Sequence, residues 1–233
     1  MNKNIDLIWN QSVVNNRINP FSSISWLNDV LWIDHLTKVE TWEPNYLVPK
    51  WLLYNEVSWI IFDYLKWKWV GFYLDTDKKS EYWYSDVSRK YVFLWLKTPR
   101  SYSKYMWVDD NVDEDTKTKL IFLHEMCHHL SYDLFSRCAY FQELFNICKS
   151  IRVNNPNNWA SKLADMNFYQ NKWIDTQATE DCVELLRIYF MCWKNESMCF
   201  EYLKSKLPNL NNSEIKKIFN LLAESVMFIF PTW

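Results

Sequence analysis

The pattern of apolar and polar positions predicts a chain made mostly of helices, with a few short strands. Apolar residues at helical spacing predict a helix over 51–66, and strand-like runs follow at 70–75 and 91–96. Acidic residues at 113–115 favour the start of a helix that runs to about Leu134. This order predicts an α+β fold in which a short mixed sheet precedes a mostly helical C-terminal part. Further helical patterns cover 138–152, 177–193, 196–206 and 213–228.

The whole chain, 1–233, is expected to form a single domain, because its length suits one sizeable core. Residues 1–50 lack regular periodicity but keep apolar residues such as Leu27 and Leu31, so we expect a packed N-terminal extension. The sequence shows no repeat, no low-complexity linker and no clean domain boundary.

Charge and cysteine content narrow the partners and the compartment. The formal net charge is -2, with 26 Lys and Arg against 28 Asp and Glu, so no basic field predicts nucleic acid or an anionic membrane as a partner. The N-terminus has no apolar run of signal-peptide length, and no window approaches the ~20 apolar residues of a membrane span. We therefore expect a soluble, cytoplasmic protein whose six cysteines, which form no C-x-x-C pair, are reduced and mostly buried.

The balance of tryptophan and glycine is abnormal. The chain has 15 Trp and one Gly, Gly71, whereas a chain of this length normally has roughly 16 glycines. We hypothesise that most of these tryptophans are glycine in the living cell, because UGA encodes Trp in some bacterial codes and Gly in others. The alternative is a truly Trp-rich protein that binds glycans or partners through aromatic platforms. Polar, turn-like contexts that favour glycine surround Trp67, Trp69, Trp159, Trp173 and Trp193.

Three of the four histidines lie in one short stretch, LIFLHEMCHHLSY at 120–132. On a helix, residues four apart share a face with Cβ atoms about 6 Å apart, so His124 and His128 can bind one zinc ion at roughly 2.0–2.1 Å. Glu125 is placed to take a proton from a metal-activated water, which completes a His-Glu-x-x-His pattern. Adjacent helix residues point in different directions, so His129 is expected to be a neighbour of the site and not a ligand.

A catalytic zinc needs a third protein ligand and one open position. The metzincin pattern is excluded, because Leu134 occupies the place of its third histidine, so the ligand must be acidic. Glu180 is the favoured ligand, and Glu184, one helical turn later, would hydrogen-bond a ligand histidine. The alternative for this pair is an exposed helix face that carries two acids. The downstream candidates are Asp133, Glu143, Asp165, Asp175, Glu180, Asp181 and Glu184.

HEMCHH at 124–129 and EDCVELLRIY at 180–189 together resemble zinc metallopeptidases of the gluzincin type. The second stretch is similar to the Glu-x-Phe-x-Glu-x-Phe-x-x-Tyr helix of lethal-factor-like catalytic domains. The resemblance extends loosely over 51–200 and implies a zincin-like metallopeptidase domain with an HExxH active-site helix. It also implies residue roles: zinc (Zn2+) would be bound by His124, His128 and Glu180, with Glu125 as general base and acid and Glu184 behind a ligand histidine.

The chain departs from these families at two positions. Cys127 stands where such enzymes often have glycine, and we expect its thiol to be a buried structural group. Trp173 stands where lethal-factor-like proteins carry a tyrosine that stabilises the oxyanion. Tyr169 is a substitute only by proximity, so the electrophilic residue is undetermined.

The sequence therefore predicts a hydrolase, a zinc-dependent metallopeptidase that cleaves a peptide or protein substrate with metal-activated water. One alternative is a regulatory protease specific for one protein target such as a repressor, and another is a zinc-bound but non-catalytic binding scaffold. The strand at 91–96 is either an edge strand that pairs with an extended peptide or an interior strand. The sequence leaves open the oligomeric state and the cleavage preference.

Overall fold

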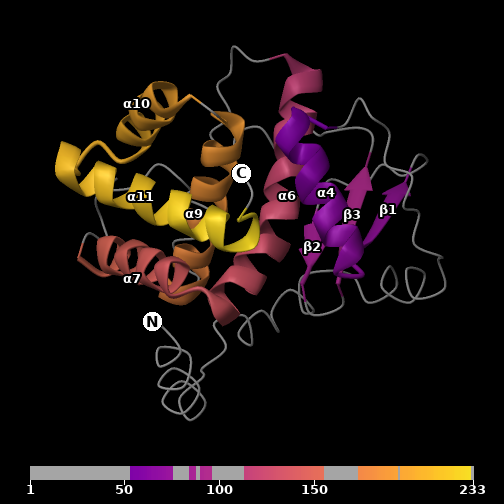
Figure 1. Cartoon of the computed structure of the whole chain (residues 1–233), viewed down its shortest axis with the longest axis horizontal. Helices are drawn as coiled ribbons and strands as arrows, with labels where there is room; N and C mark the ends of the chain where they lie inside the picture. Colours follow the sequence, from indigo (N-terminus) through magenta and orange to yellow (C-terminus); the bar gives the residue numbers. More distant parts are fainter. Residues whose placement is uncertain are drawn as a thin grey trace, which may run out of the picture. The chain divides into compact units, whose positions relative to one another are not determined.

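The computed structural model describes residues 53–75, 84–87, 90–95, 113–154, 173–193 and 195–231 (Figure 1). All of them belong to one structural unit, 43–233. The expected N-terminal extension, 1–50, lies outside the described residues, as do Tyr169, Asp165 and most of the Asn-rich stretch 154–161.

The described residues are largely helical, with a small sheet near the start, so the order expected from the sequence is confirmed. Each predicted helix and both predicted strands are present, with ends that differ by a few residues. Strand β2 was not foreseen, because it lies in the polar stretch DTDKKSEYWYSD. The elements are α4 (Glu56–Trp67), β1 (Gly71–Asp75), β2 (Tyr84–Asp86), β3 (Tyr91–Trp95), α6 (Glu114–Arg137), α7 (Ala139–Asn154), α9 (Ile174–Met191), α10 (Glu196–Lys206) and α11 (Asn212–Ile229).

Polar side chains fix where several helices begin. The Asp113 carboxylate accepts a hydrogen bond from the Thr116 backbone N–H at 2.9 Å, which confirms the start of α6 expected from the acidic cluster. Helix α11 begins with a capping box, in which Asn211 and Glu214 each accept from the other's backbone N–H at 3.0 and 2.8 Å.

The sheet is mixed, with strand order β1-β3-β2. Strands β1 and β3 pair in parallel, with Gly71 opposite Tyr91, whereas β2 pairs with β3 in antiparallel, with Tyr84 opposite Phe93. Within the described sheet, β3 is therefore the interior strand, and β1 and β2 are the edge strands.

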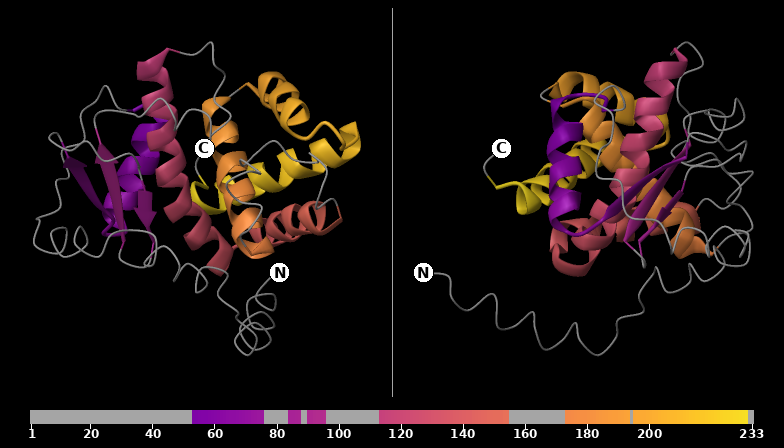
Figure 2. Two further views of the ribbon diagram at one scale, coloured as in Figure 1. Left: turned by 180° about the vertical axis from the view of Figure 1, so that it is seen from behind. Right: turned by 90° about the vertical axis from the view of Figure 1, so that its right-hand side faces the viewer.

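Helix α6 lies between the sheet with α4 on one side and helices α7, α9, α10 and α11 on the other (Figures 1 and 2). On the sheet side, the Phe72 ring contacts Phe62 at 4.7 Å and Phe122 at 5.9 Å between centroids, which joins α4, β1 and α6. On the other side, α6 packs against α7 and α9. Residues 121–127 are buried on every side of the helix, so this segment runs through the centre of the core.

Helix α4 ends in a Schellman motif, in which tryptophan takes the place that glycine usually occupies. Trp69 has φ 63°, its N–H donates to the Lys66 carbonyl at 2.9 Å, and the Val70 N–H donates to the Leu65 carbonyl at 3.0 Å. The Trp69 side chain is 78% exposed, so packing does not explain why a bulky residue stands here. Trp59, by contrast, lies inside α4 with its ring edge-on to Phe62, where glycine would not suit the helix.

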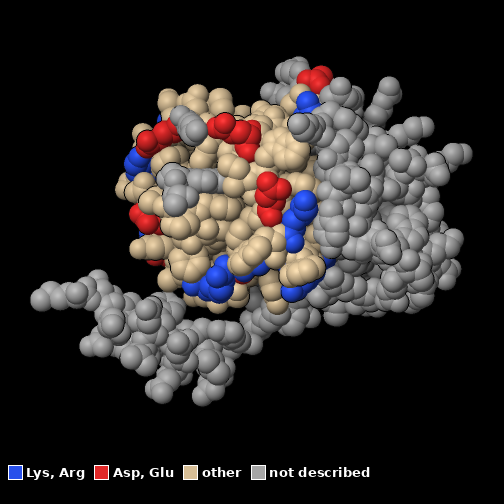
Figure 3. All heavy atoms as spheres, turned by 45° about the vertical axis from the view of Figure 1, so that its right-hand side comes forward, with Lys and Arg blue, Asp and Glu red and all other residues tan. Residues whose placement is uncertain are grey.

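The charged surface and the cysteines agree with the expectations from composition. Figure 3 shows lysine, arginine and acidic side chains of both signs on one face of the described residues. Within the described ranges, no helix has both the length and the hydropathy that crossing a membrane requires. All six cysteines are free and buried.

Candidate metal centre

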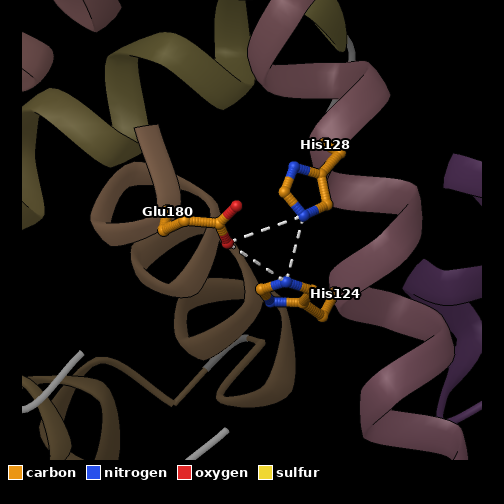
Figure 4. Close-up of side chains that lie close together, drawn as sticks. All are labelled: His124, His128 and Glu180. Atoms are coloured by element: carbon orange, nitrogen blue, oxygen red, sulfur yellow. Dashed lines mark hydrogen bonds and ion pairs between the residues drawn. The ribbon is translucent and has the colours of Figure 1, made fainter. Parts of the chain in front are cut away.

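Three donor atoms from two helices converge in the core (Figure 4). The two imidazoles of α6, His124 and His128, lie edge to face at 86° with their Nε2 atoms 3.1 Å apart. The Oε2 atom of Glu180 on α9 lies 3.6 Å from the first and 3.7 Å from the second. These three groups could hold one metal ion.

The size of this triangle matches a transition-metal ion. For sides of 3.1, 3.6 and 3.7 Å, the point equidistant from the three atoms lies about 2.0 Å from each, against roughly 2.0–2.2 Å for zinc bound to imidazole nitrogen or carboxylate oxygen. The side chains of His128 and Glu180 keep 17% and 14% of their surface exposed, whereas that of His124 keeps 9%. His128 and Glu180 are therefore the two donors that are only partly buried.

Glu184 and Arg187 lie behind His124. Oε1 of Glu184 is 2.6 Å from Nδ1 of His124, close but not well aligned for a hydrogen bond. Its Oε2 accepts from Arg187 Nε at 2.9 Å and lies 2.8 Å from the Nη2 atom. Burial by itself would raise the pKa of Glu184, but Arg187 and His124 outweigh it and hold that pKa at about 2. An ionised carboxylate therefore stands behind the imidazole and directs Nε2 toward Glu180.

The pKa values of the two imidazoles shift in opposite directions. Burial lowers the pKa of His128 well below its usual value, and the neighbouring His124 and His129 lower it further. His128 is therefore neutral, the form that binds a metal. Burial also acts to lower the pKa of His124, but Glu184 outweighs it and raises that pKa above its usual value.

The carboxylates around the triangle outnumber the guanidinium groups. Burial raises the pKa of Glu180 from 4.5 to about 7, with His124 opposing and Glu125 and Glu184 adding to the rise. Near the triangle lie four acids, Glu125, Glu180, Asp181 and Glu184, and two arginines, Arg152 and Arg187, so negative charge is in excess among these groups once Glu180 is ionised. A divalent cation between the three donor atoms would balance that excess.

Glu125 contacts strand β2 from the middle of α6. Its side chain is buried, and the Ser85 hydroxyl lies 2.7 Å from its backbone carbonyl oxygen and 2.9 Å from its Oε2. No sequence pattern indicated Ser85, because it is a serine in a polar stretch with no strand-like periodicity.

A buried ion pair fixes α9 against α7 next to the site. Arg152 donates from Nε to Asp181 Oδ2 at 2.7 Å and from Nη2 to Oδ1 at 2.5 Å, and both side chains are almost completely buried. Asp181 directly follows Glu180, so this bidentate pair restrains the helix that carries the third donor. The sequence analysis did not foresee this pair, because it joins residues 29 positions apart.

The other acidic candidates for the third ligand are engaged elsewhere or lie outside the described residues. Glu184 is different, because its Oε1 lies 2.6 Å from Nδ1 of His124, although without an aligned hydrogen bond. Asp133 contacts Tyr64 and Arg137, Glu143 pairs with Lys217, Asp175 pairs with Lys149, Asp181 pairs with Arg152, and Asp165 is not described.

The structure describes both positions, Cys127 and Trp173, that depart from the pattern of the zinc metallopeptidases. Cys127 is fully buried, and burial raises the pKa of its thiol well above the usual value, so it is an inert core group. Trp173 precedes α9 as its N-cap, 74% exposed and without a capping hydrogen bond from its side chain. His129 is buried and does not belong to the group of three donors.

No protein-family model matches the chain, and no match is found among curated proteins or solved structures.

Proposed function

We propose that the protein is a zinc-dependent metallopeptidase with a zincin-like catalytic domain. The observation that carries this proposal is the triangle of His124, His128 and Glu180, sized for a zinc ion, with Glu125 on the same helix. Two imidazoles and one carboxylate form a donor set typical of catalytic zinc, because structural zinc sites usually have four protein ligands rich in cysteine. The partial exposure of His128 and Glu180 suits a site that admits a substrate.

The residues around the triangle have distinct tasks in peptide hydrolysis. When bound, a zinc ion would polarise the scissile carbonyl and bring the pKa of a water molecule toward ~7. The Glu125 carboxylate accepts the proton of the attacking water and delivers it to the leaving nitrogen. Glu184, held ionised by Arg187, keeps the His124 ring in the orientation that binds the metal.

The small sheet suits a peptide substrate. Strand β2 is at the edge of the described sheet and carries Ser85, which touches Glu125. An extended peptide that pairs with this edge would pass beside the general base. Both a general peptidase and a regulatory protease with one protein target are compatible with this arrangement, whereas a zinc-bound scaffold would need no buried carboxylate at position 125.

Zinc content tests the metal site. Elemental analysis of purified protein is expected to give about one zinc per chain, and markedly less for Glu180→Ala, because two imidazoles alone hold zinc weakly. The matched control is Glu143→Ala, which removes an exposed glutamate that pairs with Lys217 on α11 and should leave the zinc content unchanged. A folded parent protein without zinc at neutral pH would refute the site.

Glu125→Gln separates an enzyme from a scaffold. The change keeps the size of the side chain and removes its ability to take a proton, so zinc content should remain while hydrolysis falls by about 10²–10⁴-fold. Hydrolysis is measured by mass spectrometry as new N-termini in a peptide library from a digested bacterial proteome. A zinc-loaded parent that cleaves no peptide and no co-purifying protein would favour the scaffold.

A further inference from the structure

Ser85 is the residue through which the sheet reaches the proposed catalytic glutamate. Its side chain is 9% exposed and that of Glu125 is 2% exposed, so water does not compete strongly for their contact. We propose that Ser85 is a positioning residue, whose hydroxyl holds the Glu125 carboxylate in the orientation that proton transfer requires. This inference rests on the proposed peptidase function.

The hydroxyl of Ser85 donates over a long range in the sequence. Ser85 and Glu125 are 40 positions apart and belong to β2 and α6. The other buried serines donate within four positions of their own helix, to a helix carbonyl or a cap, although Ser225 also accepts from the Cys138 thiol at 3.9 Å. These local bonds are Ser58 to Asn55, Ser131 to His128 and Ser225 to Leu221.

The bond from Ser85 restricts the orientation of the Glu125 carboxylate. A glutamate side chain has three rotatable bonds, and ordering them costs entropy unless contacts fix the end of the chain. A hydrogen bond to an ionised oxygen is stronger than one between neutral groups, and the hydroxyl lies 2.9 Å from Oε2. The strand that supplies Ser85 is paired with β3 and packs on α6, so the donor itself is held by the fold.

The hydroxyl has a second acceptor on the same residue. The Glu125 backbone carbonyl oxygen lies 2.7 Å from Oγ, while a hydroxyl carries one proton and can also accept. After Glu125 takes up a proton, Oγ can accept from the carboxylic acid and donate to the carbonyl. The same contact therefore serves both forms of the general base without movement of the backbone.

The test compares Ser85→Ala and Ser85→Thr in the zinc-loaded, full-length protein. A peptide found cleaved in the proteome-derived library serves as substrate for kcat and KM. Loss of a hydrogen bond to an ionised group predicts that Ser85→Ala lowers kcat by about tenfold to hundredfold, with KM and zinc content unchanged. Ser85→Thr keeps the hydroxyl and suits a strand, so its kcat should return to within a few-fold of the parent.

Two further measurements keep the inference separable from the proposed function. The matched control is Ser225→Ala. This change removes a buried serine hydroxyl that donates to the Leu221 carbonyl within α11 and accepts from the Cys138 thiol, and it should leave kcat unchanged. The 13C signal of the Glu125 carboxyl carbon, identified by its absence in Glu125→Gln, should shift in Ser85→Ala and hold in Ser85→Thr. An active parent with an unchanged kcat in Ser85→Ala, or an unmoved 13C signal, would overturn the positioning role. A zinc-loaded parent that cleaves nothing would instead overturn the peptidase proposal, and the 13C signal would still decide whether Ser85 orients Glu125.

Discussion

Replacing Trp69 with glycine is expected to stabilise the protein, although the change removes a tryptophan side chain, the largest of the standard amino acids. Trp69 has φ 63° just past the end of α4, in the left-handed region where a Cβ atom is crowded by the backbone. The backbone bonds of the Schellman motif hold it there, with the Trp69 and Val70 N–H groups donating to Lys66 and Leu65.

The magnitude follows from three opposing effects. The left-handed conformation costs a residue with a Cβ atom roughly 1–2 kcal/mol, which glycine avoids. Glycine loses about 0.4–1 kcal/mol through the greater freedom of its unfolded chain. The Trp69 side chain is 78% exposed, so little apolar burial is lost with it. The Trp69→Gly variant is therefore expected to exceed the Trp69→Ala variant in free energy of unfolding by about 1 kcal/mol.

A second tryptophan, two positions earlier, supplies the control. Trp67 is also exposed, at 71%, but it is the last residue of α4, where glycine is disfavoured relative to alanine by up to about 1 kcal/mol. Glycine should thus be better than alanine at position 69 and worse at position 67. The four variants Trp67→Gly, Trp67→Ala, Trp69→Gly and Trp69→Ala are compared by urea unfolding, and a difference of 1 kcal/mol corresponds to roughly 2–4 °C in Tm. If the difference in free energy of unfolding between the glycine and alanine variants had the same sign at positions 67 and 69, the conformational argument would be refuted.

Peptide masses from the native source then decide whether the recoding hypothesis holds. A peptide that spans Trp67 and Trp69 shows glycine or tryptophan directly, and tryptophan at both would end the hypothesis. The structure favours glycine at position 69, where φ is positive. It does not favour glycine at position 59, because Trp59 lies within α4 and its ring contacts Phe62.

Two further predictions concern the metal centre. In the metal-free protein, Glu180 has a pKa of about 7 against 4.5 for the free side chain, so between pH 4.5 and 7 the folded state holds a proton that the unfolded state releases. Raising the pH over this range should therefore lower the free energy of unfolding of the parent by about 3 kcal/mol relative to that of Glu180→Gln. Urea unfolding with a chelator measures this difference, and parallel pH curves for the two proteins would contradict it. Glu184→Gln is expected to weaken zinc binding by about 10–100-fold in competition with a zinc-binding dye, while the control Glu143→Gln leaves it unchanged. Equal zinc affinities in Glu184→Gln and the parent would argue that Glu184 does not orient the His124 imidazole for metal binding.

The sequence predicted the helical elements and the three donors because local rules govern them. Helical periodicity and acidic first turns placed α6, and a spacing of four put His124 and His128 on one face of it. Glu180 and Glu184 followed from the same spacing on α9, and the structure brings both to His124. Short-range geometry placed each pair on one helix face, whereas the expectation that α9 meets α6 rested on the HExxH motif and on the resemblance to zinc metallopeptidases.

Two other contacts near the donors join distant parts of the chain, and the sequence did not reveal them. Strand β2 is three residues long in a polar stretch, so no period of two could indicate it or place Ser85 beside Glu125. The pair Arg152 and Asp181 depends on how α7 and α9 pack, which no residue pattern specifies. From the sequence alone, this buried pair cannot be distinguished from an arginine and an aspartate that are exposed to solvent on separate helices.

The arrangement of charges links metal binding to the stability of the fold. The donors stand on α6 and α9, the two helices that form the centre of the core, and not on a surface loop. Arg187 holds Glu184 ionised and Arg152 pairs with Asp181, whereas Glu180 lies close enough to the buried Glu125 to be repelled by it. Burial raises the pKa of Glu180 when no metal is present, and repulsion from Glu125 adds to the rise. A divalent cation removes that repulsion, so part of its binding energy becomes folding energy. The same cation would leave the Glu125 carboxylate ionised beside it, which is the state a general base requires.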